Sequence, residues 1–196
     1  MEPLASKIRP NKPTEYVGQE HLGGKGKPLR VAIETKELFS FVLWGPPGSG
    51  KTTLARIYAN ALGAEFHEIS AVDAGKEDMK RVLSAGKLKF SGKPTVLFVD
   101  EIHRFNKAQQ DAFLPYVERG DITLIGATTE NPSFEIIAPL LSRCRVFVLE
   151  ELKEKDMEKI LLRAGMKIPK DARGWLIQMA GGDARQALTV LETAQK

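Results

Sequence analysis

Residues 45–52 read Gly-Pro-Pro-Gly-Ser-Gly-Lys-Thr, the pattern G-x-x-x-x-G-K-[ST] of a phosphate-binding loop. An apolar, strand-like run at 41–44 precedes the loop, and a helix-like run at 51–62 follows it. In this order, backbone N–H groups and the positive end of a helix point at phosphate oxygens. A glycine-rich turn is the alternative, although such a turn does not require Gly-Lys-Thr. We therefore expect a nucleotide to be bound by Gly45, Pro46, Pro47, Gly48, Ser49, Gly50, Lys51, Thr52 and Thr53.

Within this loop, two side chains have predicted contacts of their own. Lys51 is expected to reach the β- and γ-phosphates of ATP, and the Thr52 hydroxyl to ligate Mg²⁺. ATP and Mg²⁺ are thus the ligands that the sequence predicts.

Composition limits the class of protein. The chain has 196 residues, 42% hydrophobic and 28% charged, enough for one α/β domain with a small appendage. Its apolar runs are strand-sized, which predicts no membrane segment, and its first residues lack the apolar core of a signal peptide. The single Cys144 fits a reducing compartment. A net charge of +4 permits contact with nucleic acid without arguing strongly for it.

Strand-like and helix-like segments alternate through the first three quarters of the chain. Such alternation predicts a parallel sheet with helices on both faces. Residues 1–28 are rich in Pro, Gly and Lys and are predicted to form an extended arm. The predicted strands are 41–44, 66–69, 95–99, 122–127 and 145–149, and the predicted helices are 29–36, 51–62, 76–87, 107–118 and 134–141.

The pattern changes after Leu149, where helices continue without strands. We predict two domains, a nucleotide-binding α/β domain with its arm at 1–149 and a helical lid at 150–196. Asn106 with Gln109, and Asp183, are predicted helix caps, since these side chains satisfy free N–H groups of a first turn. The lid helices are expected at 153–163, 170–180 and 183–195.

Two acids, Asp100 and Glu101, directly follow the apolar run at 95–99. Asp100 is expected to hold Mg²⁺ through water, because Mg²⁺ keeps much of its hydration shell. Glu101 is expected to orient and activate the attacking water. A polar strand end is the alternative reading of this pair. His103 is interpreted as a packing residue, with a coupling role as its alternative.

Three further residues are candidates for contact with the γ-phosphate or the attacking water. Thr128 ends an apolar run, and an ordinary Thr/Asn turn is its alternative. Arg143 precedes a predicted edge strand and would reach a neighbouring subunit, or else form a structural ion pair. Arg185 lies in the first turn of a helix, where the helix dipole disfavours a cation unless an anion binds nearby. A plain surface arginine is the alternative for Arg185.

Together these elements resemble the AAA+ ATPases of the clamp-loader-like branch. The resemblance is closer to the replication-associated recombination proteins of the RarA/MgsA family, relatives of the Werner-helicase-interacting protein. It is carried by Val17-Gly18-Gln19-Glu20-His21-Leu22, Asp100-Glu101-Ile102-His103-Arg104-Phe105-Asn106-Lys107 and Gly126-Ala127-Thr128-Thr129-Glu130-Asn131-Pro132, among other stretches, and covers essentially the whole chain.

The resemblance implies a role for each matching residue. Thr128 is similar to sensor 1, Arg143 to an arginine finger acting in trans, and Arg185 to sensor 2. Val17 and Gly18 resemble the segment that packs near adenine. The implied fold is an α/β AAA+ P-loop NTPase with a five-stranded parallel sheet, order 5-1-4-3-2, and a small all-α lid.

The resemblance also implies a biological setting. The implied protein is a DNA-dependent ATPase that remodels DNA or DNA-bound proteins in replication-fork maintenance, recombination and repair. Its implied location is the cytoplasm, in association with the nucleoid, or the nucleus in a eukaryote. The implied partners are single-stranded, gapped or forked DNA and single-strand-binding protein. The family continues into a C-terminal helical domain used for tetramer assembly, so a homo-oligomer is expected for the full-length family and a monomer for this chain by itself.

Two alternatives stay open for the function. One is a clamp-loader subunit or a Holliday-junction branch-migration motor, and the other is a nucleotide-gated recruitment module that scarcely hydrolyses ATP. For DNA, the basic residues Lys76, Lys80 and Arg81 are the candidate phosphate contacts, with a solvated surface as their alternative.

Overall fold

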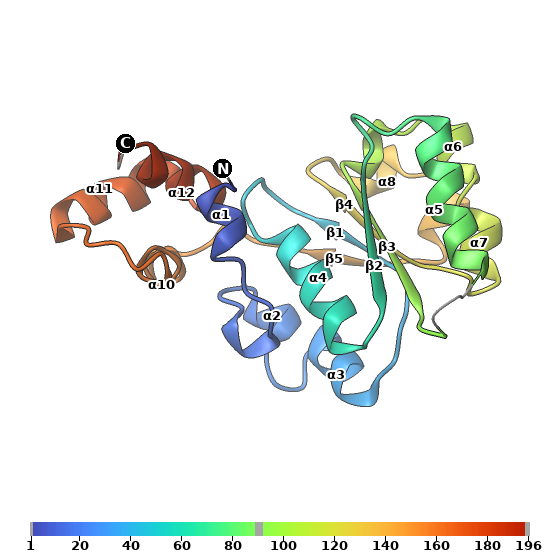
Figure 1. Cartoon of the computed structure of the whole chain (residues 1–196), viewed down its shortest axis with the longest axis horizontal. Helices are drawn as coiled ribbons and strands as arrows, with labels where there is room; N and C mark the ends of the chain where they lie inside the picture. The colour runs from blue at the N-terminus through green and yellow to red at the C-terminus, as the bar shows by residue number, and fades with distance from the viewer. Residues whose placement is uncertain (1, 89–91, 195–196) are drawn as a thin grey trace.

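The computed structural model describes residues 2–88 and 92–194, without the side chains of Lys76, Lys80 and residues 85–88. A five-stranded sheet lies at the centre, and a helical bundle lies to one side of it (Figure 1). The strands are β1 (Phe41–Trp44), β2 (Glu65–Ser70), β3 (Thr95–Asp100), β4 (Thr123–Thr128) and β5 (Arg145–Val148). None of the described helices is both long and apolar enough to cross a bilayer.

All strand pairs in the sheet are parallel, in the order β2-β3-β4-β1-β5. Read from the other edge this is 5-1-4-3-2, so the predicted order is confirmed. β1 lies between β4 and β5, with Phe41 opposite both Ile125 and Arg145. Because the strands are parallel, the loops after β1, β3 and β4 all leave the same carboxyl edge of the sheet.

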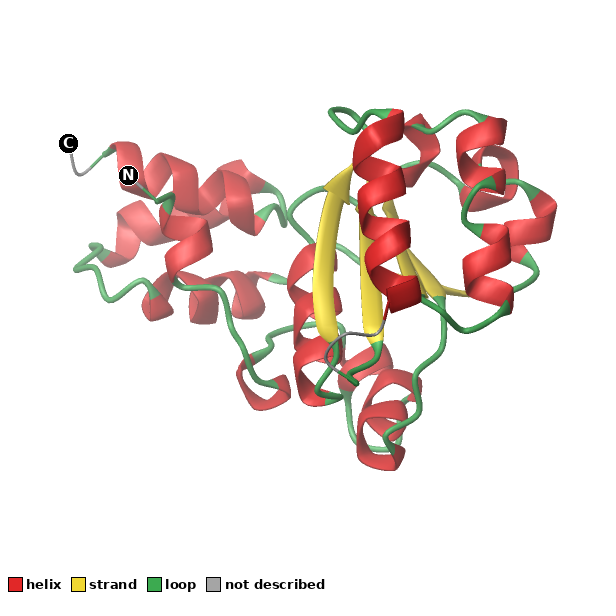
Figure 2. Ribbon diagram, turned by 45° about the vertical axis from the view of Figure 1, so that its right-hand side comes forward, coloured by secondary structure: helices red, strands yellow, loops and turns green. Residues whose placement is uncertain are grey.

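Helices cover both faces of the sheet, as the alternating pattern predicts (Figure 2). On one face, α3 (Pro28–Thr35) and α4 (Lys51–Ala61) pack with Phe41 and Leu43. On the other face, Val42 packs in a second core with α5 (Lys76–Leu88) and the helices after β3. Successive residues of one buried strand thus point into different cores, the period-two arrangement of a pleated strand.

The segment before the sheet is not the extended arm that its composition predicts. It contains α1 (Leu4–Lys7), a 3₁₀ turn at Pro13–Glu15, and α2 (Glu20–Gly23). Leu4 is buried in the core of the helical bundle, and its backbone N–H donates to Glu192 Oε2 at 3.1 Å. The arm is therefore ordered by tertiary contacts that composition alone does not reveal.

Two predicted helices are each broken into two in the structure. The predicted helix 107–118 is α6 (Lys107–Asp111) and α7 (Leu114–Glu118), and 134–141 is α8 (Pro132–Glu135) and α9 (Ala138–Leu141). Pro115 and Pro139 lie in the first turns of the second members. Proline has no N–H for the helical ladder and is tolerated there, so each one starts a new helix. A 3₁₀ turn, η2 (Ile102–Arg104), connects β3 to α6.

After β5 the chain forms α10 (Glu154–Arg163), α11 (Lys170–Ala180) and α12 (Ala184–Thr193). These helices share a core of their own with α1 (Figure 1). Both predicted caps are confirmed: Asn106 and Gln109 form a reciprocal capping box, and Asp183 accepts from Gln186 N at 2.9 Å. The domain boundary near residue 150 stays a prediction.

Candidate nucleotide-binding site

The loop after β1 forms one wall of a cavity between the sheet and the helical bundle. Gly48 and Gly50 have φ values of +67° and +98°, a backbone region that glycine adopts without steric cost. A Cβ at Gly48 would lie 1.9 Å from Asp183 Oδ1, so only glycine lets the cap of α12 approach the loop. The loop residues that line the cavity are Pro47, Gly48, Ser49, Gly50, Lys51, Thr52 and Thr53.

Lys51 begins α4 and points back into its own loop. Its Nζ donates to the carbonyl oxygens of Gly45 at 2.7 Å and Pro46 at 2.8 Å. Gly45 and Pro46 do not line the cavity themselves, and their carbonyl groups hold the lysine. Burial lowers the pKa of Lys51, while the nearby carboxylates of Glu101 and Asp100 raise it. The ammonium group thus sits among groups that a phosphate oxygen can replace as partners.

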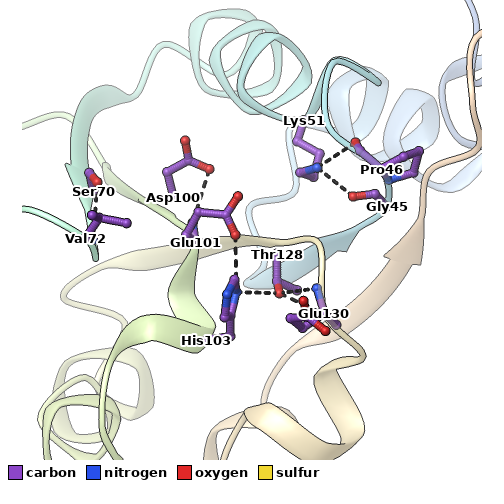
Figure 3. A network of polar contacts seen from close by, with 10 residues as sticks. All are labelled: Gly45, Pro46, Lys51, Ser70, Val72, Asp100, Glu101, His103, Thr128 and Glu130. Atoms are coloured by element: carbon purple, nitrogen blue, oxygen red, sulfur yellow. Dashed lines mark hydrogen bonds and ion pairs between the residues drawn. The ribbon is translucent and has the colours of Figure 1, made fainter. Parts of the chain in front are cut away.

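Asp100 and Glu101 reach the same cavity from the end of β3. Glu101 has φ +52°, an uncommon conformation for a residue with a side chain. This turn ends the strand, and Glu101 N donates to Asp100 Oδ1 at 3.2 Å. The two acids and Lys51 therefore come together at the carboxyl edge of the sheet, where loops after parallel strands bind ligands (Figure 3).

Thr128, at the end of β4, is fully buried and is not part of the cavity wall. Its Oγ1 lies 2.9 Å from His103 Nδ1, and the same nitrogen lies 3.2 Å from Glu101 Oε2 (Figure 3). The structure thus connects Thr128 to Glu101 through His103. The histidine was interpreted from sequence mainly as a packing residue.

The helical bundle and the arm complete the cavity. Of the residues expected there, Val17 and Arg185 line it, and the Arg185 side chain has no ion pair or hydrogen bond with any residue in 2–88 or 92–194. Burial, and then the charge of Arg56, lowers the pKa of Arg9, and Arg185 acts in the same direction.

Sequence reasoning missed several lining residues, which are Ile8, Arg9, Tyr16, Ile160, Arg163 and Leu188.

Tyr16 and Gln19 lie beside the two residues that the resemblance assigned to adenine. Tyr16 Oη donates to Gly50 O at 3.4 Å, and burial raises the Tyr16 pKa above its usual range. The buried Gln19 donates to Glu150 O at 2.7 Å and accepts from Glu150 N at 3.0 Å. Gly18 packs against Leu152 rather than lining the cavity. The signal available for Tyr16 and Gln19 was their adjacency to Val17 and Gly18.

Arg143 lies away from this cavity. It lies two residues before β5, at the amino edge of the sheet, whereas the phosphate loop leaves the carboxyl edge. Its Nη2 pairs with Glu118 Oε1 at 2.5 Å, and its Nη1 donates to Pro139 O at 2.7 Å. The structure therefore does not bring Arg143 to the nucleotide site of its own chain.

The candidate DNA contacts lie on α5, also away from the cavity. The side chains of Lys76 and Lys80 are outside the described part of the structure. Arg81 is exposed and pairs with Asp78 at 2.9 Å, so part of its charge is neutralised.

The sequence model of the ATPase family associated with various cellular activities (AAA) matches residues 41–152. This range is more than half of the chain and contains the loop, both acids, Thr128 and Arg143. The chain belongs to the AAA family of ATPases. The predicted family, fold class and class of enzyme are thereby confirmed.

Known proteins also resemble the chain over nearly its whole length. Replication-associated recombination protein A of Coxiella burnetii is 53% identical over 97% of this chain and 46% of its own length. ATPase WRNIP1 of Dictyostelium discoideum is 44% identical over 99% of this chain and 23% of its own. These matches confirm the resemblance to the replication-associated recombination proteins. The chain spans about half the length of the Coxiella relative.

The structural comparison gives a third relative. The RuvB Holliday junction branch migration motor of Thermotoga maritima superimposes with a TM-score of 0.75 at 30% identity, over 94% of this chain and 64% of that one.

Proposed function

We propose that this chain is the ATP-hydrolysing core of a DNA-dependent AAA+ ATPase that acts in replication-fork maintenance, recombination and repair. The observation that carries the proposal is the convergence of Lys51, Asp100 and Glu101 on one cavity, which is also lined by Arg185, a residue whose side chain has no partner among residues 2–88 and 92–194. Three of these residues come from the sheet edge and one from the helical bundle. A triphosphate between them would be held by both parts of the molecule.

The residues at the cavity fit a magnesium ion bound with the nucleotide. The Thr52 hydroxyl and the Asp100 carboxylate both line the cavity, and oxygen donors of these kinds are those that Mg²⁺ prefers. Thr52 and Asp100 would hold Mg²⁺, which supplies positive charge to the β- and γ-phosphate oxygens when bound.

The chain's own groups account for the remaining chemistry of hydrolysis. Lys51 would exchange the carbonyls of Gly45 and Pro46 for phosphate oxygens, and Glu101 would orient and deprotonate the attacking water. Arg185 would place a second positive charge on the γ-phosphate from α12. Arg143 would supply a third charge to the site of a neighbouring subunit.

The DNA-related part of the proposal rests on the relatives. Two are named for replication-associated recombination and for branch migration at Holliday junctions. We therefore propose single-stranded, gapped or forked DNA and single-strand-binding protein as partners, and a nucleoid-associated location.

A branch-migration motor is the second candidate, favoured by the structural match to RuvB. If four-way junctions stimulate ATP hydrolysis more than forked DNA does, that result would favour the branch-migration motor.

The first test is ATP hydrolysis as a function of protein concentration, with and without forked or gapped DNA. We expect the rate per subunit to rise with concentration and with DNA, because Arg143 has to come from a neighbour. Glu101→Gln should bind ATP normally and lose about a hundredfold or more in rate. Glu130→Gln, an exposed carboxylate nearby, is the matched control and should keep the rate. Tight ATP binding with no turnover would instead favour a recruitment module.

The second test concerns DNA binding by α5. Replacing Lys80 and Arg81 together by Ala should weaken binding and reduce the slope of log affinity against log salt by about two, since each lost phosphate contact contributes about one. Lys155→Ala with Lys159→Ala removes the same charge from the exposed side of α10 and serves as the control. Equal slopes in both double variants would remove α5 from the DNA interface.

A further inference from the structure

His103 lies between the two groups that act on the reacting end of the nucleotide, and nothing in the family match explains why. It belongs to the 3₁₀ turn η2, directly after Glu101, and its side chain is only 9% exposed. Its Nδ1 lies 2.9 Å from Thr128 Oγ1 and 3.2 Å from Glu101 Oε2 (Figure 3). One nitrogen therefore faces both a hydroxyl and a carboxylate.

The surroundings of the Thr128 hydroxyl indicate which atom carries the proton. Glu130 N donates to Thr128 Oγ1 at 3.0 Å, and the hydroxyl can donate to Glu130 O at 3.2 Å. A hydroxyl has one proton to give and two lone pairs to accept with. If His103 Nδ1 carries a proton, it fills the second lone pair, and every donor and acceptor around Oγ1 has a partner.

The opposite tautomer leaves the network incomplete. Thr128 would then donate its only proton to Nδ1, and Glu130 O would lose it. Glu101 Oε2, which is buried and makes no aligned hydrogen bond in the described residues, would also face a nitrogen lone pair at 3.2 Å. A carboxylate so placed is stabilised by an N–H and destabilised by a lone pair.

We propose that His103 is a positioning residue whose Nδ1–H orients the Thr128 hydroxyl as a donor and holds the Glu101 carboxylate beside it. With both lone pairs of Oγ1 filled by N–H groups, the hydroxyl acts only as a donor, to Glu130 O. Glu101 lines the cavity and would meet the water, while the buried Thr128 supports it through His103. This role rests on the proposed ATPase function, but the tautomer itself does not.

The protonation of Nδ1 can be measured without turnover. The chain has three histidines, so long-range ¹H–¹⁵N spectra of the ring nitrogens under mildly alkaline conditions should resolve each one. The signals that disappear in His103→Asn belong to His103. If His103→Asn does not fold, the double variant His21→Gln with His67→Gln retains only the signals of His103. We expect Nδ1 to carry the proton. A ring protonated on Nε2 alone would overturn the proposal, whether or not the chain hydrolyses ATP.

Turnover gives the second readout. His103→Leu should lower kcat about tenfold, the effect of one lost hydrogen bond, with ATP affinity unchanged. His103→Asn, which keeps an N–H donor near the Nδ1 position, should restore most of the rate. Because Thr128 acts on Glu101 through His103, His103→Leu with Thr128→Val should be no slower than the slower single variant. Multiplied losses, or an Asn variant as slow as Leu, would contradict the proposal. Absence of turnover in the wild-type chain would contradict only the ATPase function.

Discussion

At the scale of single residues, Gly48 shows how closely the helical bundle approaches the phosphate loop. A methyl group there would meet Asp183, which caps the helix that carries Arg185. We expect Gly48→Ala to displace this cap and to weaken ATP binding about tenfold or more, as measured by titration with a fluorescent nucleotide.

Gly63 provides the matched control for this prediction. It has φ +66°, close to the +67° of Gly48, but no heavy atom of a non-adjacent described residue lies within 4 Å of its Cβ position. Gly63→Ala should thus carry the same backbone strain, about 1 kcal/mol, and leave ATP affinity unchanged. Equal affinity losses in both variants would show that backbone strain, rather than contact with Asp183, causes the effect.

Cys144 is a second residue with a measurable environment. Burial raises its thiol pKa from 9.0 to about 12. Because the folded state favours the neutral thiol, this contribution to stability is complete below pH 9.0 and is lost as the pH rises toward about 12. We expect iodoacetamide at pH 8 to alkylate the folded chain at least about tenfold more slowly than the urea-unfolded chain, because the thiolate is the nucleophile. Equal alkylation rates for the folded and the unfolded chain would contradict the burial of the Cys144 thiol.

At the scale of elements, Gln110 connects segments that proline has separated. Its Nε2 donates to Phe105 O at 2.9 Å and Glu135 O at 3.0 Å, and its Oε1 accepts from Ile137 N at 2.9 Å. Gln110→Leu would leave these three backbone groups, which surround the buried amide of Gln110, without that partner. We expect it to lower the free energy of unfolding by about 2–4 kcal/mol, measured by urea denaturation.

An exposed glutamine serves as the control for Gln110. Gln178 lies on α11 with its side chain in solvent, so Gln178→Leu should change the free energy of unfolding by less than about 0.5 kcal/mol. If the two variants were equally stable, the hydrogen bonds of Gln110 would not be what holds α6 to the segment around α8 and α9.

At the scale of the whole molecule, the sheet separates Arg143 from the candidate nucleotide-binding cavity. The four residues of β1 alone span about 13 Å from the amino edge of the sheet to its carboxyl edge. If Arg143 acts on a neighbour, each active site takes its loop and Glu101 from one subunit and its arginine from the next. An Arg143→Ala subunit beside a Glu101→Gln subunit would then form one complete site, with Glu101 from the first and Arg143 from the second. Mixing the two inactive variants at high protein concentration should therefore restore part of the ATPase rate. A mixture as inactive as either variant would contradict action in trans.

The local features of this protein were determined by its sequence. The glycine pattern and Gly-Lys-Thr predicted the loop, apolar runs predicted the five strands, and Asn106, Gln109 and Asp183 predicted caps that the structure contains. These features depend on neighbours within a few residues, so local pattern is enough to find them. The sheet order followed from the family resemblance, because alternation alone fits several orders.

Only the tertiary structure decided which distant segments meet. It brought Arg9 and Tyr16 of the arm to the cavity, placed His103 between Glu101 and Thr128, and set Arg143 at the opposite edge of the sheet with Glu118. It also ordered the arm by packing Leu4 into the core of the helical bundle. Such contacts join residues that are far apart in the chain, and they form because burial and hydrogen bonding are satisfied in space. Hydrophobic periodicity and residue spacing describe only the neighbours along the chain and therefore could not predict them.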